Sequence, residues 1–431
     1  MQYNFDKIID RRHTDALKVD NVPVIWGRDD LLPLWVADMD FETPDFIMDA
    51  LRERCDHPVL GYTCRARAWY ESIVRWQQTR FGWTISEDWL NYVPGIVPGI
   101  AFAIHCFTRP GDKILIQTPV YHPYILVPRN NGREVITTEF RMGESLPPTP
   151  FQGGGDCGSA SANAVTRANP NSPSLGEGGG RLASSLMEVD WADFERKAEG
   201  CKLFLLCHPH NPGGRVWTRD ELARMADICQ RKGVIVVSDE IHADLTLPGY
   251  HHIPFASVSE VAAQNSITFA SPSKAFNMAG LTSSYSVIPN AALRQQFAEF
   301  LDHSELNLGH LFAFISVAAA YSHGTEWLDQ CLAYIQGNID YMEQYLSAHT
   351  PRISMIRPEA SYLVFLDCRA LGLTVDELNR FMVDDAHLAL NDGAMFGRPG
   401  EGFMRFNAAS PRSVIEQAMH QLHAAYTKRF G

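Results

Sequence analysis

The chain has 431 residues, of which 45% are hydrophobic and 20% charged, so it is long enough to bury a large core without disulfide or metal support. Its net charge of −13 argues against nucleic acid or an anionic membrane surface as the main partner, because both require a basic face. The nine cysteines are scattered and form no CxxC pair, which excludes a disulfide framework or zinc ribbon and favours a reducing cytoplasm.

The first residues, MQYNFDKIIDRR, contain two aspartates and no apolar run, so we expect no signal peptide. The longest apolar run, 311–321, is too short to cross a membrane. We therefore expect a cytoplasmic protein without a membrane anchor. The first 45 or so residues lack strong periodicity, and we expect them to form an arm that packs on a small domain or on a partner.

Apolar runs alternate with helical patterns from about residue 90 to 290. Four runs with polar exits predict short buried strands, at 113–121, 202–209, 234–241 and 266–271. A helix between the second and third begins with the capping box of Thr218 and Glu221 and ends at Gly233. This order predicts a mostly parallel sheet, with its chemistry at the carboxyl ends of the strands.

The last third of the chain has a different pattern. Residues 291–350 are predicted to form long helices, followed by strands at 360–368 and 402–409 and a closing helix at 411–428. This pattern indicates a second, smaller α/β domain. The predicted organisation is an arm and part of the small domain at 1–45, a large domain at 46–290, and linking helices with the small domain at 291–431.

One segment, 152–187, has no aromatic residue and is rich in glycine and serine. Such a segment cannot offset its ordering entropy by burial, so we expect a disordered insertion between two core elements. A glycine-rich nucleotide loop is the alternative, but neither GxGxxG nor GxxxxGK[ST] is present.

Four motifs at strand exits carry the candidate chemistry. Lys274 lies in SPSK directly after a strand, framed by two hydroxyls, which suits a lysine that binds a carbonyl cofactor covalently. Asp239 ends a buried strand, where a carboxylate is costly unless it is paired. Asn211 follows another strand in CHPHNPGG. The loop YVPGIVPGI, at 92–100, enters a helix with free N–H groups that favour an anion.

In this order the motifs resemble pyridoxal 5′-phosphate (PLP) enzymes of the aspartate-aminotransferase fold, fold type I. The stretches YNFDKIIDRR, LPLWVADMDFETP, HNPGGRVWTRDEL, SDEIHADL and SPSKAFNMAGL are similar to the MalY/PatB group of cystathionine β-lyases, or C–S lyases. The resemblance covers nearly the whole chain outside 152–187. It implies PLP as cofactor, an amino-acid substrate and a homodimer with a shared active site.

The resemblance also implies roles around the cofactor ring. Lys274 would carry PLP and move the Cα proton of the substrate. Asp239 would face the pyridine nitrogen, Asn211 would donate to O3′, and Tyr121 would stack on the ring. His242 stands where many aminotransferases have a tyrosine, as in the C–S lyase group.

Ser271 and Ser273 would bind the phosphate of PLP together with the backbone N–H groups of Ile96 and Val97. Many aminotransferases have a serine or threonine in this loop, whereas here Val97 precedes Pro98, which cannot donate.

Three further residues are implied outside the ring and phosphate. Arg405 would clamp the substrate carboxylate, and Tyr62 would reach the phosphate or substrate of the neighbouring subunit. Asp38 and Asp40 could be paired acid–base carboxylates, but we favour a backbone role that shapes the substrate mouth. Tyr62 as a packing residue and Arg405 as a surface residue remain alternatives.

The favoured activity is β-elimination from cystathionine or a related cysteine S-conjugate, with methionine biosynthesis as the implied setting. An aminotransferase and a PLP-binding regulatory protein are the alternatives. Cys207, His208 and His210 could be imagined as a metal cluster, but their context indicates the frame of the Asn211 loop, and we expect no metal.

Overall fold

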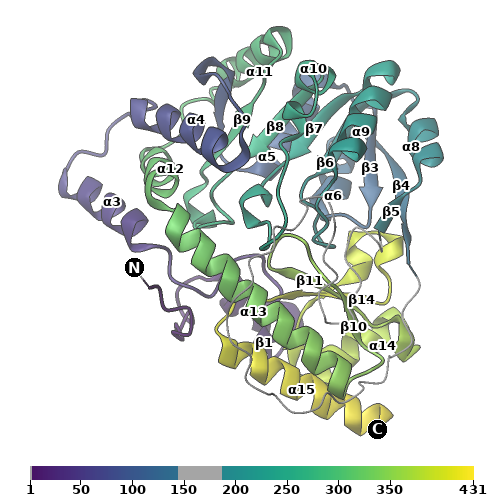
Figure 1. The fold of residues 1–431 in the computed structure, drawn as a ribbon. Coiled ribbons are helices and arrows are strands. Elements are labelled where there is room, and N and C mark those ends of the chain that lie inside the picture. The colour runs from purple at the N-terminus through teal and green to yellow at the C-terminus, as the bar shows by residue number, and fades with distance from the viewer. Residues whose placement is uncertain (1, 144–186) are drawn as a thin grey trace, which may run out of the picture.

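The computed structural model describes residues 2–143 and 187–431, and its largest element is an eight-stranded sheet (Figure 1). The strands are β2 (Leu90–Val93), β3 (Lys113–Thr118), β4 (Glu134–Met142), β5 (Met187–Val189), β6 (Cys201–Cys207), β7 (Ile235–Asp239), β8 (Ser266–Ala270) and β9 (Ser284–Val287). Their order is β2-β9-β8-β7-β6-β3-β4-β5. The five strands from β8 to β4 are parallel, as predicted, and antiparallel strands extend both edges.

The central strand β6 is buried on both faces, which explains its continuous apolar sequence. Leu203 and Leu205 join one core cluster with helices α5 (Ile96–Phe107), α6 (Pro123–Asn130) and α11 (Ala291–His303). Phe204 and Leu206 join another with α8 (Trp191–Ala198) and α9 (Arg219–Lys232). The predicted capping box of α9 is present, and its Gly233 has a φ of 66°, the left-handed conformation that glycine adopts without strain.

A smaller antiparallel sheet follows in the order β10-β11-β14-β13. Its strands are β10 (Ser354–Ile356), β11 (Leu363–Asp367), β13 (Asn391–Asp392) and β14 (Phe403–Asn407). The 25-residue helix α13 (Thr325–His349) runs from the large sheet to this sheet and packs beside α15 (Arg412–Phe430) (Figure 1). Among the remaining helices are α3 (Asp45–Asp56), α4 (Arg67–Phe81), α10 (Glu260–Gln264), α12 (Leu311–His323) and α14 (Val375–Arg380). The fold is therefore the predicted α/β fold of type I PLP enzymes.

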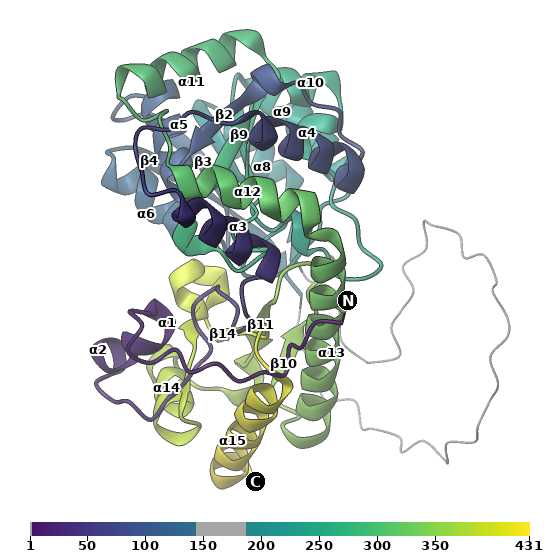
Figure 2. The same cartoon turned by 90° about the vertical axis from the view of Figure 1, so that its left-hand side faces the viewer.

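The N-terminal residues pack beside the smaller sheet (Figure 2). They form α1 (Leu17–Asp20), α2 (Val22–Trp26) and β1 (Leu32–Pro33), and β1 pairs in parallel with β12 (Leu388–Ala389). The arm was expected to pack on the small domain or on a partner, and in this structure it packs on the C-terminal part of its own chain.

The predicted insertion at 152–187 lies outside the described residues except at its last position. Met187 begins β5, pairs with Met142 and is fully buried, so the prediction was wrong there. Its side chain packs with Phe194 and Trp217, a contact that low-complexity composition cannot reveal. Over 2–143 and 187–431, no helix has the length and hydropathy that a membrane span requires.

Candidate active site

A cavity of about 220 Å³ lies at the carboxyl ends of the parallel strands, against the start of α5. Parallel strands direct their exits to one sheet edge, which is why residues far apart in sequence meet there. Most of the predicted cofactor residues line this cavity, namely Ile96, Val97, Tyr121, Asn211, Asp239, His242, Ser273 and Lys274.

Lys274 is buried, and its Nζ donates a hydrogen bond to the carbonyl of Ala37 at 2.5 Å. Burial lowers the pKa of this amine to about 8, the charge of Arg405 adds to the effect, and the carboxylates of Asp38 and Asp239 oppose it. An amine with this pKa is partly neutral near pH 7, as a nucleophile or general base must be.

Asp239 is buried and accepts two hydrogen bonds, from the hydroxyl of Tyr124 at 2.8 Å and from the backbone N–H of Ile241 at 3.1 Å. Burial nevertheless raises the pKa of this carboxyl to about 6. A cationic partner facing the carboxylate would reverse that shift. Sequence analysis missed Tyr124, although it lies only three residues after Tyr121.

Asn211 and Arg405 contact each other beside Tyr121. The Asn211 Oδ1 accepts from Arg405 Nη1 at 3.2 Å, and the Asn211 carbonyl accepts from the Tyr121 N–H at 3.0 Å. Arg405 also donates to the Trp35 carbonyl and to Asn391, at 2.9 and 2.6 Å, and its buried Nε has no partner among the described residues. Arg405 is therefore a buried arginine that uses three of its five N–H groups in these hydrogen bonds and keeps its Nε–H for a ligand, and burial lowers its pKa to about 10.

Hydroxyls and helix N–H groups lie at another part of the cavity. Ser273 lines it, whereas Ser271 lies behind, donating to the carbonyl of Ser283 at 3.0 Å and contacting Ser273 Oγ at 2.8 Å. The first residues of α5, Ile96 and Val97, have no intrahelical acceptor for their N–H groups. Thr282 and Ser284 also line the cavity and were not predicted from the sequence.

His242 lines the cavity as a buried neutral imidazole. Burial and the neighbouring charges of Lys274 and Arg405 lower its pKa to about 3. Its Nδ1 is buried and has no hydrogen-bond partner among the described residues.

Asp38 and Tyr62 do not line this cavity. Asp38 accepts from Arg11 at 2.6 Å and lines a neighbouring cavity of about 490 Å³. Tyr62 is fully exposed on the segment between α3 and α4. Any role of Tyr62 at a cofactor therefore requires a second copy of the chain.

The imagined cluster of Cys207, His208 and His210 is not a cluster of ligands in the fold. His208 instead lies with Glu240 and His252, with candidate ligand atoms within 4.8 Å of one another. His252 Nε2 hydrogen bonds to Glu240 Oε2 at 2.7 Å, and His208 Nε2 to the carbonyl of Ile253 at 2.8 Å. The cluster thus contains one hydrogen bond between its own side chains, and His208 is held to the backbone.

The fold and this lysine-containing cavity define a PLP-dependent enzyme of fold type I, and comparisons with known proteins agree. Residues 182–422 match the family described as aminotransferase class I and II, and the chain belongs to that family. It is 37% identical to cystathionine beta-lyase PatB of Bacillus subtilis, over 98% of this chain and 99% of that protein.

Two solved structures extend the comparison. PLP-containing cystalysin from Treponema denticola matches with a TM-score of 0.86 at 30% identity, covering 99% of this chain and 100% of the other. A PLP-bound C–S lyase from Staphylococcus hominis matches with a TM-score of 0.82 at 30% identity, covering 99% and 98%. The most similar proteins thus include C–S lyases, and the cofactor is PLP.

The described residues fit this cofactor. The cavity contains a buried amine of lowered pKa, a buried carboxyl without a cationic partner in contact, and an aromatic ring from Tyr121. Hydroxyls and the start of α5 supply the donors that a phosphate needs. These groups come from separate strands, which positions them around one ligand.

Proposed function

We propose that the chain is a C–S β-lyase that cleaves L-cystathionine, or a related L-cysteine S-conjugate, to a thiol, pyruvate and ammonia. The observation that carries the proposal is the near full-length identity of 37% to a cystathionine β-lyase, combined with a cavity lined by the implied lysine and aspartate and an arginine that contacts its lining residue Asn211. Cytoplasmic location and a place in methionine biosynthesis follow from this activity as part of the proposal.

In this proposal Lys274 would hold PLP through its amine, and the same amine would take the proton from Cα of the substrate. Its pKa of about 8 suits both steps. PLP, when bound, supplies an electron sink that stabilises the negative charge developing at Cα. Asp239 keeps the ring nitrogen protonated, and the Nδ2 amide of Asn211 donates to O3′, since its Oδ1 already accepts from Arg405.

Arg405 binds the substrate carboxylate. Its guanidinium is held by three protein oxygens and leaves Nε for the ligand, so it is oriented before the substrate arrives. The carboxylate fixes the substrate, and Lys274 then reaches the Cα–H bond. Departure of the thiolate from Cβ competes with return of the proton, and a good leaving group favours elimination.

The proposal includes a homodimer in which Tyr62 reaches the cofactor site of the partner subunit. Tyr62 is fully exposed, and the neighbouring Val59 and Leu60 are also exposed, at 60% and 63%. Adjacent exposed apolar side chains suit burial against a second copy.

The deciding experiment supplies cystathionine to the purified holoenzyme without any keto acid. Continuous release of pyruvate, ammonia and homocysteine is expected. A single stoichiometric burst that resumes only when a keto acid is added would identify an aminotransferase instead. Absence of either reaction, with PLP bound, would favour the regulatory alternative.

A further inference from the structure

The segment 35–41, here called the strap, passes the cofactor cavity, which its residue Ala37 lines. Its backbone carbonyls accept hydrogen bonds from groups of the site. Trp35 accepts from Arg405, and Ala37 accepts from Lys274 at 2.5 Å and from the hydroxyl of Tyr362 at 3.0 Å. The Nδ2 of Asn407 donates to the carbonyls of residues 36 and 38, at 2.7 and 2.6 Å. The path of the strap backbone thus sets the distance between Lys274 and Arg405.

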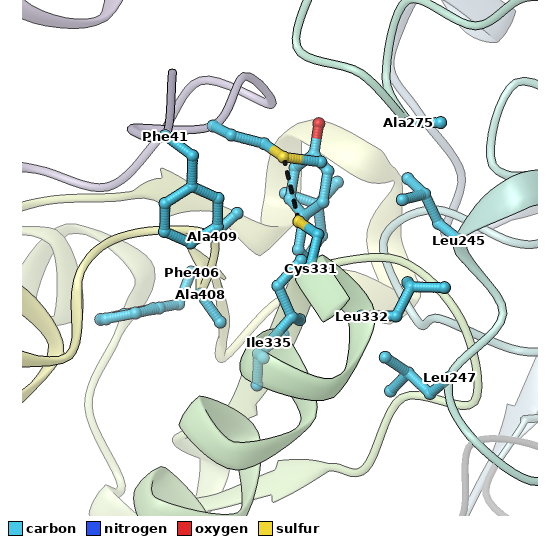
Figure 3. Close-up of a cluster of buried hydrophobic side chains, with 14 of the residues drawn as sticks. Phe41, Leu245, Leu247, Ala275, Cys331, Leu332, Ile335, Phe406, Ala408 and Ala409 are labelled. Carbon is cyan, nitrogen blue, oxygen red and sulfur yellow. Dashed lines mark hydrogen bonds between the residues drawn. The ribbon is translucent and has the colours of Figure 1, made fainter. Parts of the chain in front are cut away.

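The strap is also held from its apolar side. Met39 and Phe41 are buried, and Cys331 Sγ of α13 lies 3.8 Å from the Met39 sulfur (Figure 3). Asn277, three residues after Lys274, accepts from the Met39 N–H at 3.0 Å and donates to the carbonyls of Met39 and Phe41, at 3.0 and 2.8 Å. The strap therefore bridges the lysine loop and α13.

A buried lysine spans the strap. Lys18 of α1 is 0% exposed, and its Nζ lies 2.7 Å from Asp40 Oδ2 and 3.5 Å from the carbonyl of Asp38. Its own carbonyl accepts from the indole N–H of Trp35 at 2.9 Å. One residue thus contacts the strap at its first, fourth and sixth positions.

Arg11 completes the charge balance, at 2.6 Å from Asp38 and 2.8 Å from Asp40. The hydroxyl of Ser410 donates to Asp40 at 2.6 Å. The positive charges of Arg11 and Lys18 therefore neutralise the negative charges of Asp38 and Asp40. Burying a lysine costs several kcal/mol in desolvation, and an apolar side chain of similar volume would often stabilise the fold equally well. The retained charge points to a requirement for one defined strap conformation.

We propose that Lys18 is a positioning residue that fixes the strap, and through it the wall that faces the Cα of the substrate opposite Lys274. The inference rests on the site assigned under the proposed function. Lys18 touches neither the cofactor cavity nor Lys274, so it acts only through the strap. It also gives a reason for the N-terminal arm to pack on the chain's own C-terminal part.

Loss of the Lys18 amine should have two separable effects. Asp40 would draw Arg11 away from Asp38, so the strap would lose its fixed conformation and the substrate would bind more weakly. Asp38 would also be less neutralised, and since its charge already raises the pKa of Lys274, the lysine would hold its proton to higher pH. Proton transfer after binding uses the same groups, so kcat should change little.

The test compares the holoenzyme with K18M, K18R and K7M. Lys7 lies in the same arm but pairs with Glu42 on the surface, both more than half exposed, so K7M is the matched control. Hydrogen–deuterium exchange is followed in the strap and in residues 412–430. For K18M we expect at least tenfold faster hydrogen exchange in the strap and unchanged exchange in residues 412–430. The KM for cystathionine should rise roughly tenfold, while kcat stays within about threefold of the wild-type value. K18R should restore most of the protection, and K7M should behave as wild type.

A second readout is the pH titration of the bound cofactor's absorbance, whose midpoint should rise in K18M. Hydrogen exchange and cofactor absorbance are measured without turnover, so both still test the role of Lys18 if cystathionine is not a substrate. If K18M does not fold, S410A removes one donor to Asp40 and should raise strap exchange two- to threefold. Unchanged strap exchange in folded K18M or S410A would overturn the inference, as would equal effects in K18M and K7M.

Discussion

Replacing Asp239 by asparagine should stabilise the apoenzyme at neutral pH while it weakens the holoenzyme. The carboxyl is buried, and its hydrogen-bond donors among the described residues are neutral, Tyr124 and the Ile241 N–H. Asparagine has the same shape and can still accept one of these hydrogen bonds. The substitution therefore removes a buried charge without creating a cavity.

The magnitude follows from the pKa of this carboxyl. An aspartate in an unfolded chain titrates near pH 3.9, whereas burial raises the pKa of Asp239 to about 6 in the fold. A raised carboxyl pKa favours folding at low pH, and the benefit is lost as pH rises through 6. The difference of about two units corresponds to about 3 kcal/mol of unfolding free energy between pH 4 and pH 8.

The assay is urea denaturation of cofactor-free wild type and D239N at several pH values. The two proteins should have similar midpoints at pH 4, and D239N should become the more stable one as pH rises from 5 to 8. With PLP added the order should invert, because the ionised carboxylate then faces a protonated ring nitrogen.

Two outcomes would refute this reasoning. If apo D239N is no more stable than wild type at pH 8, the carboxylate is not desolvated as its burial implies. If D239N binds PLP as tightly as wild type, Asp239 does not face the ring nitrogen. Tyr124→Phe serves as the control, because it removes one hydrogen-bond donor to Asp239 but keeps the ionisable carboxyl. It should raise the pKa of that carboxyl further.

Three further predictions follow from the site. Lys274→Ala should lose the PLP linkage that borohydride reduces in wild type and nearly all turnover, and a labelled peptide containing another lysine would contradict the assignment. Mixing inactive Tyr62→Phe and Lys274→Ala proteins should restore part of the activity in heterodimers, and a monomer in sedimentation would exclude a shared site. Replacing 152–184 with a short Gly-Ser link should leave urea stability and PLP affinity nearly unchanged. Met142 and Met187 pair across β4 and β5, and the free energy of loop closure changes by only about 0.6 kcal/mol per doubling of loop length. A loss of PLP affinity would show that the segment contributes to the site.

The strands that carry the site were predictable because burial on both faces leaves a clear pattern. β3, β6, β7 and β8 appear in the sequence as apolar runs, each followed by a polar exit. The antiparallel strands β2 and β9 at one end of the sheet were not predicted. They are only four residues long and include polar residues such as Asn91 and Ser286, so no run distinguishes them from loops.

The site residues also include some that the sequence predicted and some that it did not. Asp239 ends β7, and Asn211 and Lys274 lie four residues after the ends of β6 and β8, so the topology brings the three together in one cavity. Thr282 and Ser284 reach that cavity through a turn that ends at Thr282 with a φ of 47°, and no local sequence pattern indicates that turn. Asp38 was predicted at the substrate mouth; it lies in the strap, paired with Arg11, and lines the neighbouring cavity.

Lys18 shows where sequence reasoning ends. In RRHTDALKVD it has the surroundings of a surface lysine, and nothing nearby in sequence requires its burial. Its partners Asp38 and Asp40 are 20 and 22 residues away, and Ser410, which shares Asp40, is almost 400 residues away. Burial of a charge depends on the sum of such distant contacts, whereas strand exits depend on local patterns. The reacting groups can therefore be predicted from the sequence, while the contacts that hold them at their working distances require the fold.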